Sequence, residues 1–243
     1  MSALNPFNIP IIRHRPKQGR VRWKRLLKWV VIAVVTSTVA LLLPLRWIDP
    51  PTSSYIMRYE KAAKRTARHQ WVDLEKMAWS MPLAAIAAED QRFPSHWGLD
   101  VRQIHYALKN NTSRRIPLGA STITQQTIKN LYLWPSRSLF RKGLEAWLSV
   151  WLEILLPKKR IIEIYLNIAQ FGKSVFGVGV ASQHYFGKDV SELTAYQASL
   201  LAASLPTPSS SNPAKPSAYL KTRGRALLKQ MRQLGWRNVI IKL

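Results

Sequence analysis

The sequence contains no cysteine. That absence excludes a disulfide framework, a thiolate metal site and a cysteine nucleophile. Acidic residues are scarce too, because 12 aspartates and glutamates stand against 37 lysines and arginines, for a formal net charge of +25. This balance is typical of proteins that bind nucleic acid, an anionic membrane surface or a phosphorylated substrate. Since 47% of the 243 residues are hydrophobic, we expect one folded domain with an appendage rather than a disordered chain.

The N-terminal region distinguishes among these partners. Residues 1–28 carry eight basic side chains and no acidic one, and residues 29–45 then run without a charge. Together with Leu26 and Leu27, this apolar stretch is just long enough to cross a bilayer as a helix. Trp29 and Trp47 stand at its two ends, where interfacial aromatic rings are favoured. The alternatives are a cleaved signal peptide, although no small-x-small cleavage site follows, and a buried core helix.

The basic flank predicts a topology. It places the N-terminus in the cytoplasm and everything after residue 46 outside it, so a nucleic-acid partner is not expected. The predicted protein crosses a membrane once and carries a periplasmic domain. The expected organisation is a basic cytoplasmic tail (1–25), a transmembrane helix (26–46), a linker and membrane-proximal helix (47–74), the main domain (75–235) and a C-terminal tail (236–243).

The main domain shows helical spacing almost throughout and no sustained period-two alternation. Proline, glycine and serine mark loops at residues 114–119, 134–136, 171–174 and 205–216. The pattern predicts a mostly α-helical domain on a single membrane stalk. The expected helices cover residues 55–69, 82–91, 100–110, 121–132, 138–155, 158–168, 176–185, 191–204 and 216–234.

An acid pair closes one of these helices. Pro82 suits the first turn of a helix, and Glu89 and Asp90 follow at the end of its apolar, alanine-rich sequence. Such surroundings raise the pKa of a carboxyl group by desolvation, which suits a general base. On its own, however, the pair is more typical of solvated charges at a helix end.

Cations gather at the start of another expected helix. Arg137, Arg141 and Glu145 are spaced by four and share one face, and Lys142 lies beside them. Cations are disfavoured near a helix N-terminus, whereas phosphates bind there, so this cluster suggests an anion site. The alternative is an ordinary Arg141–Glu145 surface pair.

Small polar residues precede a further lysine. Residues 119–126 read Gly-Ala-Ser-Thr-Ile-Thr-Gln-Gln, and Lys129 follows one turn later. The hydroxyl of Ser121 and the amides of Gln125 and Gln126 suit hydrogen bonds to a sugar or a phosphate. A plain helix N-cap at Ser121 is the alternative, and both can hold at once.

Four segments in order carry a family resemblance. The pattern E-D-x-x-F-x-x-H-x-G is matched at residues 89–98, G-x-S-T-x-T-Q-Q at 119–126, R-K-x-x-E at 141–145 and K-x-x-I-x-E-x-Y-L-N at 158–167. Together they resemble the glycosyltransferase family 51 domain, the peptidoglycan glycosyltransferases also found at the front of bifunctional penicillin-binding proteins. The resemblance covers roughly residues 75–235. One departure is Ser174, which stands where the family's F/W-G-x-G has its second glycine.

The resemblance implies an all-α, lysozyme-like glycosyltransferase domain with one N-terminal transmembrane helix. It also implies the substrate lipid II, a disaccharide-peptide on a polyprenyl pyrophosphate, and a growing lipid-linked glycan strand. Glu89 becomes the general base and Glu145 a second essential carboxylate. The implied substrate-binding residues are Ser121, Gln125, Gln126, Lys129, Arg137, Arg141 and Lys142.

Further expectations concern the metal and the partners. The five histidines show no metal-binding spacing, so no dedicated metal site is expected, and His96 reads as a structural member of its motif. No cofactor is required, and Mg²⁺ or Mn²⁺ would act through the substrate pyrophosphate. Membrane lipids and other cell-wall synthases are the candidate partners. The competing functions are a membrane-anchored lytic transglycosylase and a non-catalytic cell-wall-synthesis scaffold. A fragment of a bifunctional protein would still lack crosslinking activity, because no S-x-x-K occurs in the chain.

Overall fold

The computed structural model describes residues 18–110, 119, 121–136, 138–235 and 239. Helix α1 (Gln18–Leu42) leads into the 3-10 turn η1 (Leu43–Arg46). Within the described residues, the stretch 23–46 is the one segment long and apolar enough to cross a membrane, as the sequence predicts. The described chain divides into two compact units, one up to Thr38 and one from Val39 on, and all four motifs belong to the second.

The second unit is predominantly helical, which confirms the predicted all-α class. Most helices begin and end within about three residues of the predicted positions, because serine and threonine caps and prolines mark their ends. The described helices are α2 (Ser54–Ala63), α3 (Ser80–Glu89), α4 (Val101–Asn110), α5 (Ile123–Tyr132), α6 (Leu139–Leu155), α7 (Lys158–Ile168), α8 (Val178–Phe186), α9 (Ala195–Ser204) and α10 (Ala218–Leu234), with 3-10 turns η2 (Leu74–Lys76), η3 (Phe93–Ser95) and η4 (Val190–Glu192).

The predicted helix 55–69 is wrong in its second half. Helix α2 ends at Ala63 because Lys64 adopts a left-handed conformation with φ of 50°. The chain then forms β1 (Arg68–His69), which pairs in parallel with β3 (Val175–Phe176). Strand β2 (Gln170–Gly172) pairs antiparallel with β3, so part of the predicted loop 171–174 is strand. Strands of two or three residues are too short to show a period-two pattern.

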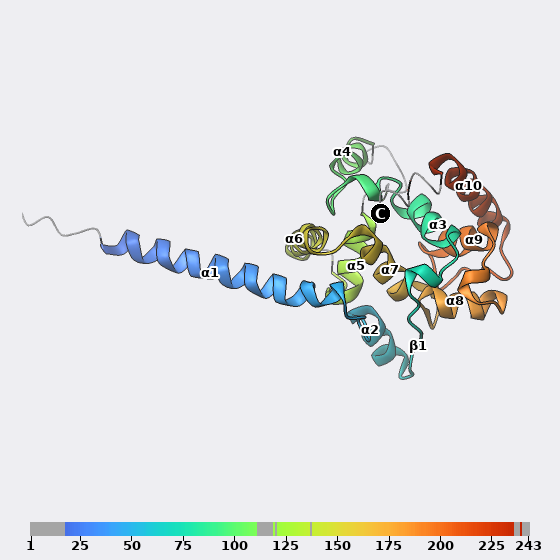
Figure 1. Cartoon of the computed structure of the whole chain (residues 1–243), viewed down its shortest axis with the longest axis horizontal. Helices are drawn as coiled ribbons and strands as arrows, with labels where there is room; N and C mark the ends of the chain where they lie inside the picture. Colours follow the sequence, from blue (N-terminus) through green and yellow to red (C-terminus); the bar gives the residue numbers. More distant parts are fainter. Residues whose placement is uncertain (1–17, 111–118, 120, 137, 236–238, 240–243) are drawn as a thin grey trace, which may run out of the picture. The chain divides into compact units, whose positions relative to one another are not determined.

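The core is built around α3. Residues 80–87 are all buried, and the helix packs against α7, α9 and α10 (Figure 1). Alanine side chains allow this close approach, and Gly224 allows α10 to lie close to α9, where an added Cβ would lie 2.9 Å from the Leu200 side chain. Because α3 is held on several sides, the acidic pair at its end has a fixed position.

Candidate active site

Glu89 and Asp90 are withdrawn from water, so the interpretation as solvated helix-end charges is wrong. Asp90 is 8% exposed and Glu89 is half-buried. An Oδ2 atom of Asp90 accepts a hydrogen bond from the Ile123 amide at 3.0 Å, at the first turn of α5. Both carboxylate oxygens lie 2.9–3.0 Å from His96 Nε2. Asp90 therefore fixes the start of α5 and the loop after α3, and Glu89 faces the open side.

Gly98 closes the same loop against α6. Its φ is +78°, and an added Cβ would lie 2.7 Å from the Ser149 carbonyl oxygen. Only glycine takes up such a conformation readily and leaves room for this contact. The Gly98 carbonyl accepts a hydrogen bond from Thr122 Oγ1 at 2.6 Å. The first motif is thus tied to the second and to α6 by contacts of the Gly98 backbone.

The N-cap of α5 is Thr122, not Ser121 as the sequence suggests. Thr122 and Gln125 form a capping box, in which Gln125 Oε1 accepts from the Thr122 amide at 3.1 Å. The Gln125 side chain is buried in this role, and its contact with substrate stays a prediction. Ser121 is left exposed, and its hydroxyl lies 3.3 Å from Lys142 Nζ of α6.

A chain of hydrogen bonds ends on Glu89. The Tyr165 hydroxyl of α7 lies 3.4 Å from Gln126 Oε1, and Gln126 Nε2 donates to Glu89 Oε2 at 2.7 Å. Burial raises the pKa of Glu89, while the Gln126 hydrogen bond and the charges of Arg223 and Lys129 oppose that rise. A carboxylate with a raised pKa and one fixed hydrogen bond is suited to accept a proton.

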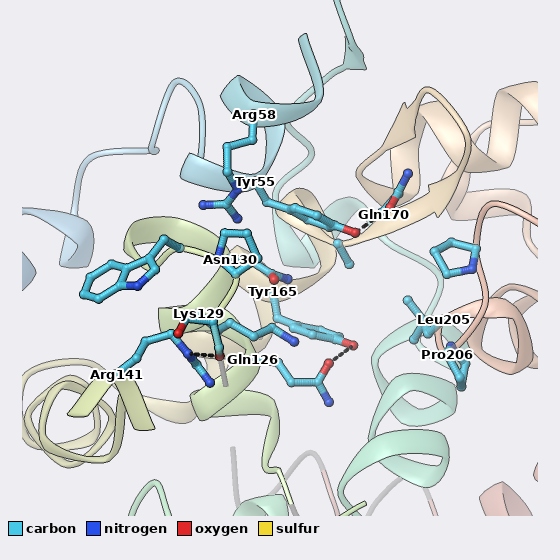
Figure 2. A pocket seen from close by; sticks show the side chains of 15 residues that line it. Tyr55, Arg58, Gln126, Lys129, Asn130, Arg141, Tyr165, Gln170, Leu205 and Pro206 are labelled. Atoms are coloured by element: carbon cyan, nitrogen blue, oxygen red, sulfur yellow. Dashed lines mark hydrogen bonds between the residues drawn. The ribbon is translucent and has the colours of Figure 1, made fainter. Parts of the chain in front are cut away.

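Lys129 lies in the field of both predicted catalytic carboxylates. Desolvation lowers the pKa of its ammonium group, whereas Glu145 and Glu89 act to raise it. Lys129 lines a cavity of about 370 Å³ together with Gln126, Arg141 and Tyr165 (Figure 2). Glu89 lines a second hollow, of about 300 Å³, with Ser121 and Thr122. Gln126 therefore connects the carboxylate beside one hollow with the cations beside the other.

Glu145 is the charge partner of two cations. Its side chain is 2% exposed and pairs with Arg141 Nη1 at 2.6 Å and with Lys142 Nζ. Arg141 Nε also donates to the Ser136 carbonyl at 2.8 Å. The predicted Arg141–Glu145 pair exists, but it is largely buried and lies beside the cavity rather than on an open surface. Arg137 lies outside the described residues.

The structure adds cavity residues that the motifs did not indicate. Tyr55 and Arg58 come from α2, far from the motifs in sequence, and Gln170 comes from β2 (Figure 2). Asn130, next to Lys129, and the loop residues Pro206 and Pro208 also line the cavity. The described lining contains the three cations Arg58, Lys129 and Arg141 and no carboxylate. Such a cavity suits a polar, anionic ligand with sugar-like hydroxyl groups.

The fourth motif stabilises the fold around the site. Glu163 Oε2 accepts from the Leu74 amide at 2.8 Å and pairs with Arg160. Asn167 bonds both the amide and the carbonyl of Val72, each at 2.8 Å. These contacts hold the segment before α3, in line with the structural role predicted for Glu163. Among the described residues, no group of three or more histidines and carboxylates is placed to hold a metal ion.

Comparisons with known proteins agree with the motifs. Residues 56–232 match the family described as Transglycosylase. A protein of Shewanella oneidensis is 44% identical over 220 residues, which cover 87% of this chain and 94% of that protein. A protein of Marinomonas sp. is 46% identical over 88% of this chain and 90% of its own, and one of Xanthomonas campestris pv. campestris is 43% identical over 90% and 94%. Each of the three is named "Biosynthetic peptidoglycan transglycosylase".

Proposed function

The chain belongs to the transglycosylase family and is a peptidoglycan glycosyltransferase, and we propose that it polymerises lipid II into glycan strands with release of polyprenyl pyrophosphate. One observation carries this proposal. A half-buried glutamate with a raised pKa, Glu89, is joined through Gln126 to a cavity lined by three cations. That combination provides a base on one side and a site for a strongly anionic leaving group on the other.

Glu89 acts as the general base. It takes the proton from the 4-hydroxyl of the acceptor sugar, and the freed oxygen attacks the anomeric carbon of the growing strand. The bond from that carbon to the pyrophosphate oxygen breaks, and the pyrophosphate leaves with the electron pair. A single displacement of this kind inverts the anomeric centre, and it needs no strong acid because pyrophosphate leaves readily.

The cations neutralise the charge that develops on the pyrophosphate. Lys129 and Arg141 line the cavity, and Lys142 stands beside them, bonded to Ser121. Arg137 is assigned to the same task by the family resemblance alone. Glu145 holds Arg141 and Lys142 in place, so we assign it a positioning role for the clamp. Gln125 and Ser121 remain the proposed polar contacts to the sugars.

The reaction as proposed requires no cofactor. Every step uses a side chain of this protein, namely proton transfer to Glu89 and charge neutralisation by Lys129 and Arg141. A divalent cation, Mg²⁺ or Mn²⁺, would enter with the pyrophosphate, whose oxygens are the ligands that such ions prefer.

The protein acts at the bacterial inner membrane in this proposal. The apolar N-terminal helix, the one such helix in the part of the chain that the structure describes, is compatible with a single-pass anchor. The basic flank at residues 1–28 orients the anchor with the N-terminus in the cytoplasm and the catalytic domain in the periplasm. The anchor keeps the active site near lipid-linked substrate and membrane lipids, and other cell-wall synthases are candidate neighbours there.

A direct assay tests the function. Purified full-length protein is given labelled lipid II, and we expect glycan polymer together with one polyprenyl pyrophosphate for each bond formed. A lytic enzyme would make no polymer and would shorten pre-made strands instead. A scaffold would do neither, and either result would overturn the proposal. The cation-lined cavity argues against cleavage, because pre-made strands carry no pyrophosphate in the interior of the chain.

A further inference from the structure

Arg58 belongs to the cavity but to none of the motifs. It lies on α2 (Ser54–Ala63), the first helix after the apolar segment, and lines the same cavity as Lys129 and Arg141. Figure 2 shows its guanidinium reaching from α2 toward Asn130, while Lys129 and Arg141 enter the cavity from α5 and α6. The positive charge of the lining is therefore distributed over two sides of the cavity.

Part of the Arg58 guanidinium has a structural role. Its Nη1 donates to the Leu133 carbonyl at 2.6 Å and to Ser54 Oγ at 3.0 Å, at the C-terminal end of α5. Ser54 Oγ also reaches that helix end, because it lies 2.9 Å from the Leu133 carbonyl and 3.2 Å from the Asn130 carbonyl. The carbonyl groups at this helix end thus have a hydrogen-bond donor other than Arg58.

The rest of the guanidinium is open to a ligand. It carries five N–H donors, and the two acceptors bonded to Nη1 leave those of Nε and Nη2. Among the described residues, no acceptor is bonded to these two atoms and no carboxylate pairs with Arg58. The nearest aromatic contact is the Tyr55 ring, 5.7 Å from the guanidinium carbon. Because an arginine stays charged, an uncompensated guanidinium beside a cavity favours an anion there.

We propose that Arg58 binds an oxyanion of the substrate, at a point of the cavity separate from the Lys129–Arg141 clamp. This inference rests on the proposed function, since it takes the occupant to be lipid-linked glycan. The neighbouring groups suit that occupant. The Tyr55 hydroxyl donates to Gln170 Oε1 at 2.8 Å. A phenol oxygen and an amide, both able to bond sugar hydroxyls, therefore lie in the same cavity as the cation. Arg58 is thus a binding residue for the substrate and not a catalytic one.

Two groups of the substrate offer the required chemistry. One is a phosphate of the pyrophosphate, and the other is a carboxylate of the peptide stem. Both accept the bidentate fork of a guanidinium. The experiment therefore compares three ligands, namely lipid II with its full peptide stem, the same molecule without the stem, and polyprenyl pyrophosphate as a competing ligand.

Arg58→Gln in the full-length protein is the main test. Loss of a charge-assisted hydrogen bond should raise KM for complete lipid II by about 10- to 100-fold, with a smaller effect on kcat. If a stem carboxylate is the anion, KM rises only for the substrate with the stem. If a phosphate is the anion, KM rises for both substrates and polyprenyl pyrophosphate competes less well. Arg65→Gln removes an exposed arginine that lies outside the cavity lining, and it should leave KM unchanged.

Three results would overturn the inference. The first is an unchanged KM in Arg58→Gln. The second is a fall in kcat alone, equal for all substrates, which would assign Arg58 to the helix end. The third is a KM that rises for both substrates while polyprenyl pyrophosphate competes as before, which would indicate a sugar contact. If Arg58→Gln fails to fold, Arg58→Lys keeps the charge without the fork, and its KM must still rise severalfold. A protein that retains polymerisation in all these variants but loses it in Glu89→Gln would keep the proposed function and reject this inference.

Discussion

Gln126 Nε2 donates to Glu89 Oε2 over 2.7 Å, and the Tyr165 hydroxyl lies 3.4 Å from the other end of the same amide. Tyr165 is buried, and burial holds the pKa of its phenol well above the ordinary value, so the hydroxyl stays a donor. It therefore bonds to the amide oxygen, which turns the amide nitrogen toward Glu89. Gln126 thus both donates a hydrogen bond to the proposed base, Glu89, and lines the cavity.

Replacing Gln126 by leucine should change the pH profile. The hydrogen bond from Gln126 acts to lower the pKa of Glu89 against the effect of burial. Without it the pKa rises further, so the acid limb of kcat/KM should move to higher pH, because the base must be ionised. The measurement is kcat/KM for glycan synthesis between pH 5 and 9. Tyr165→Phe should shift the limb in the same direction but less, and a limb that stays in place in both variants would contradict this role.

Replacing Glu89 by glutamine should stabilise the protein at neutral pH. Burial raises the pKa of Glu89 above its ordinary value of 4.5, so the folded state binds the proton more tightly than the unfolded state does. The resulting stability is complete below the unfolded pKa and is lost as the pH rises through the folded pKa. Glu89→Gln should therefore melt at a higher temperature than wild type at pH 7.5 and at nearly the same temperature at pH 4. A lower melting temperature at pH 7.5 would mean that the carboxylate is well stabilised in the fold.

Glu145→Gln should separate anion binding from catalysis. Glu145 neutralises Arg141 and Lys142, so its loss should let inorganic pyrophosphate bind severalfold more tightly. Glycan synthesis should nevertheless fall by about 100-fold, because the cations lose their fixed positions. Calorimetry with pyrophosphate and the polymerisation assay provide the two readouts. If the variant binds pyrophosphate with the affinity of wild type, Arg141 and Lys142 do not contact the bound pyrophosphate.

Two glycine substitutions form a matched pair for stability. Gly98→Ala must adopt φ of +78° and place its Cβ 2.7 Å from the Ser149 carbonyl, so it should cost about 2 kcal/mol or more. Gly143→Ala lies within α6 with open space around it and should stabilise the helix by about 0.5–1 kcal/mol. Thermal unfolding in detergent should move the two melting temperatures in opposite directions. Equal shifts would contradict the geometry described for Gly98.

Local signals allowed the helices to be predicted. Predicted and observed starts agree closely at α6 and α10, where Ser138 and Ser217 cap the first turn. The end of α2 at Lys64 has no such signal in the sequence, because lysine rarely adopts a left-handed conformation. Strand β1 has only two residues, which are too few to show an alternating pattern. The true cap of α5 was missed by one residue, since Ser121 and Thr122 are both good caps and only the capping box distinguishes them.

The site was predicted only where its residues lie in or close to the four motifs. The burial of Glu89 and Asp90 depends on α5 and α10 packing near them, which the local sequence does not reveal. Arg58 and Gln170 reach the cavity from segments far from the motifs, so no spacing pattern connects them with Lys129. The family resemblance supplied the roles of the carboxylates, and the structure supplied the hydrogen bond between Glu89 and Gln126.

Glycan synthesis by Glu89→Gln tests the central claim most directly. The full-length variant is compared with wild type and with Glu192→Gln, which removes an exposed carboxylate outside both hollows. Polymer formation from labelled lipid II at pH 7.5 is followed by gel, with the folded state checked by thermal melting. We predict that Glu89→Gln is folded and synthesises strands at least about 100-fold more slowly, while Glu192→Gln matches wild type. Undiminished polymer from a folded Glu89→Gln protein would show that Glu89 is not the base.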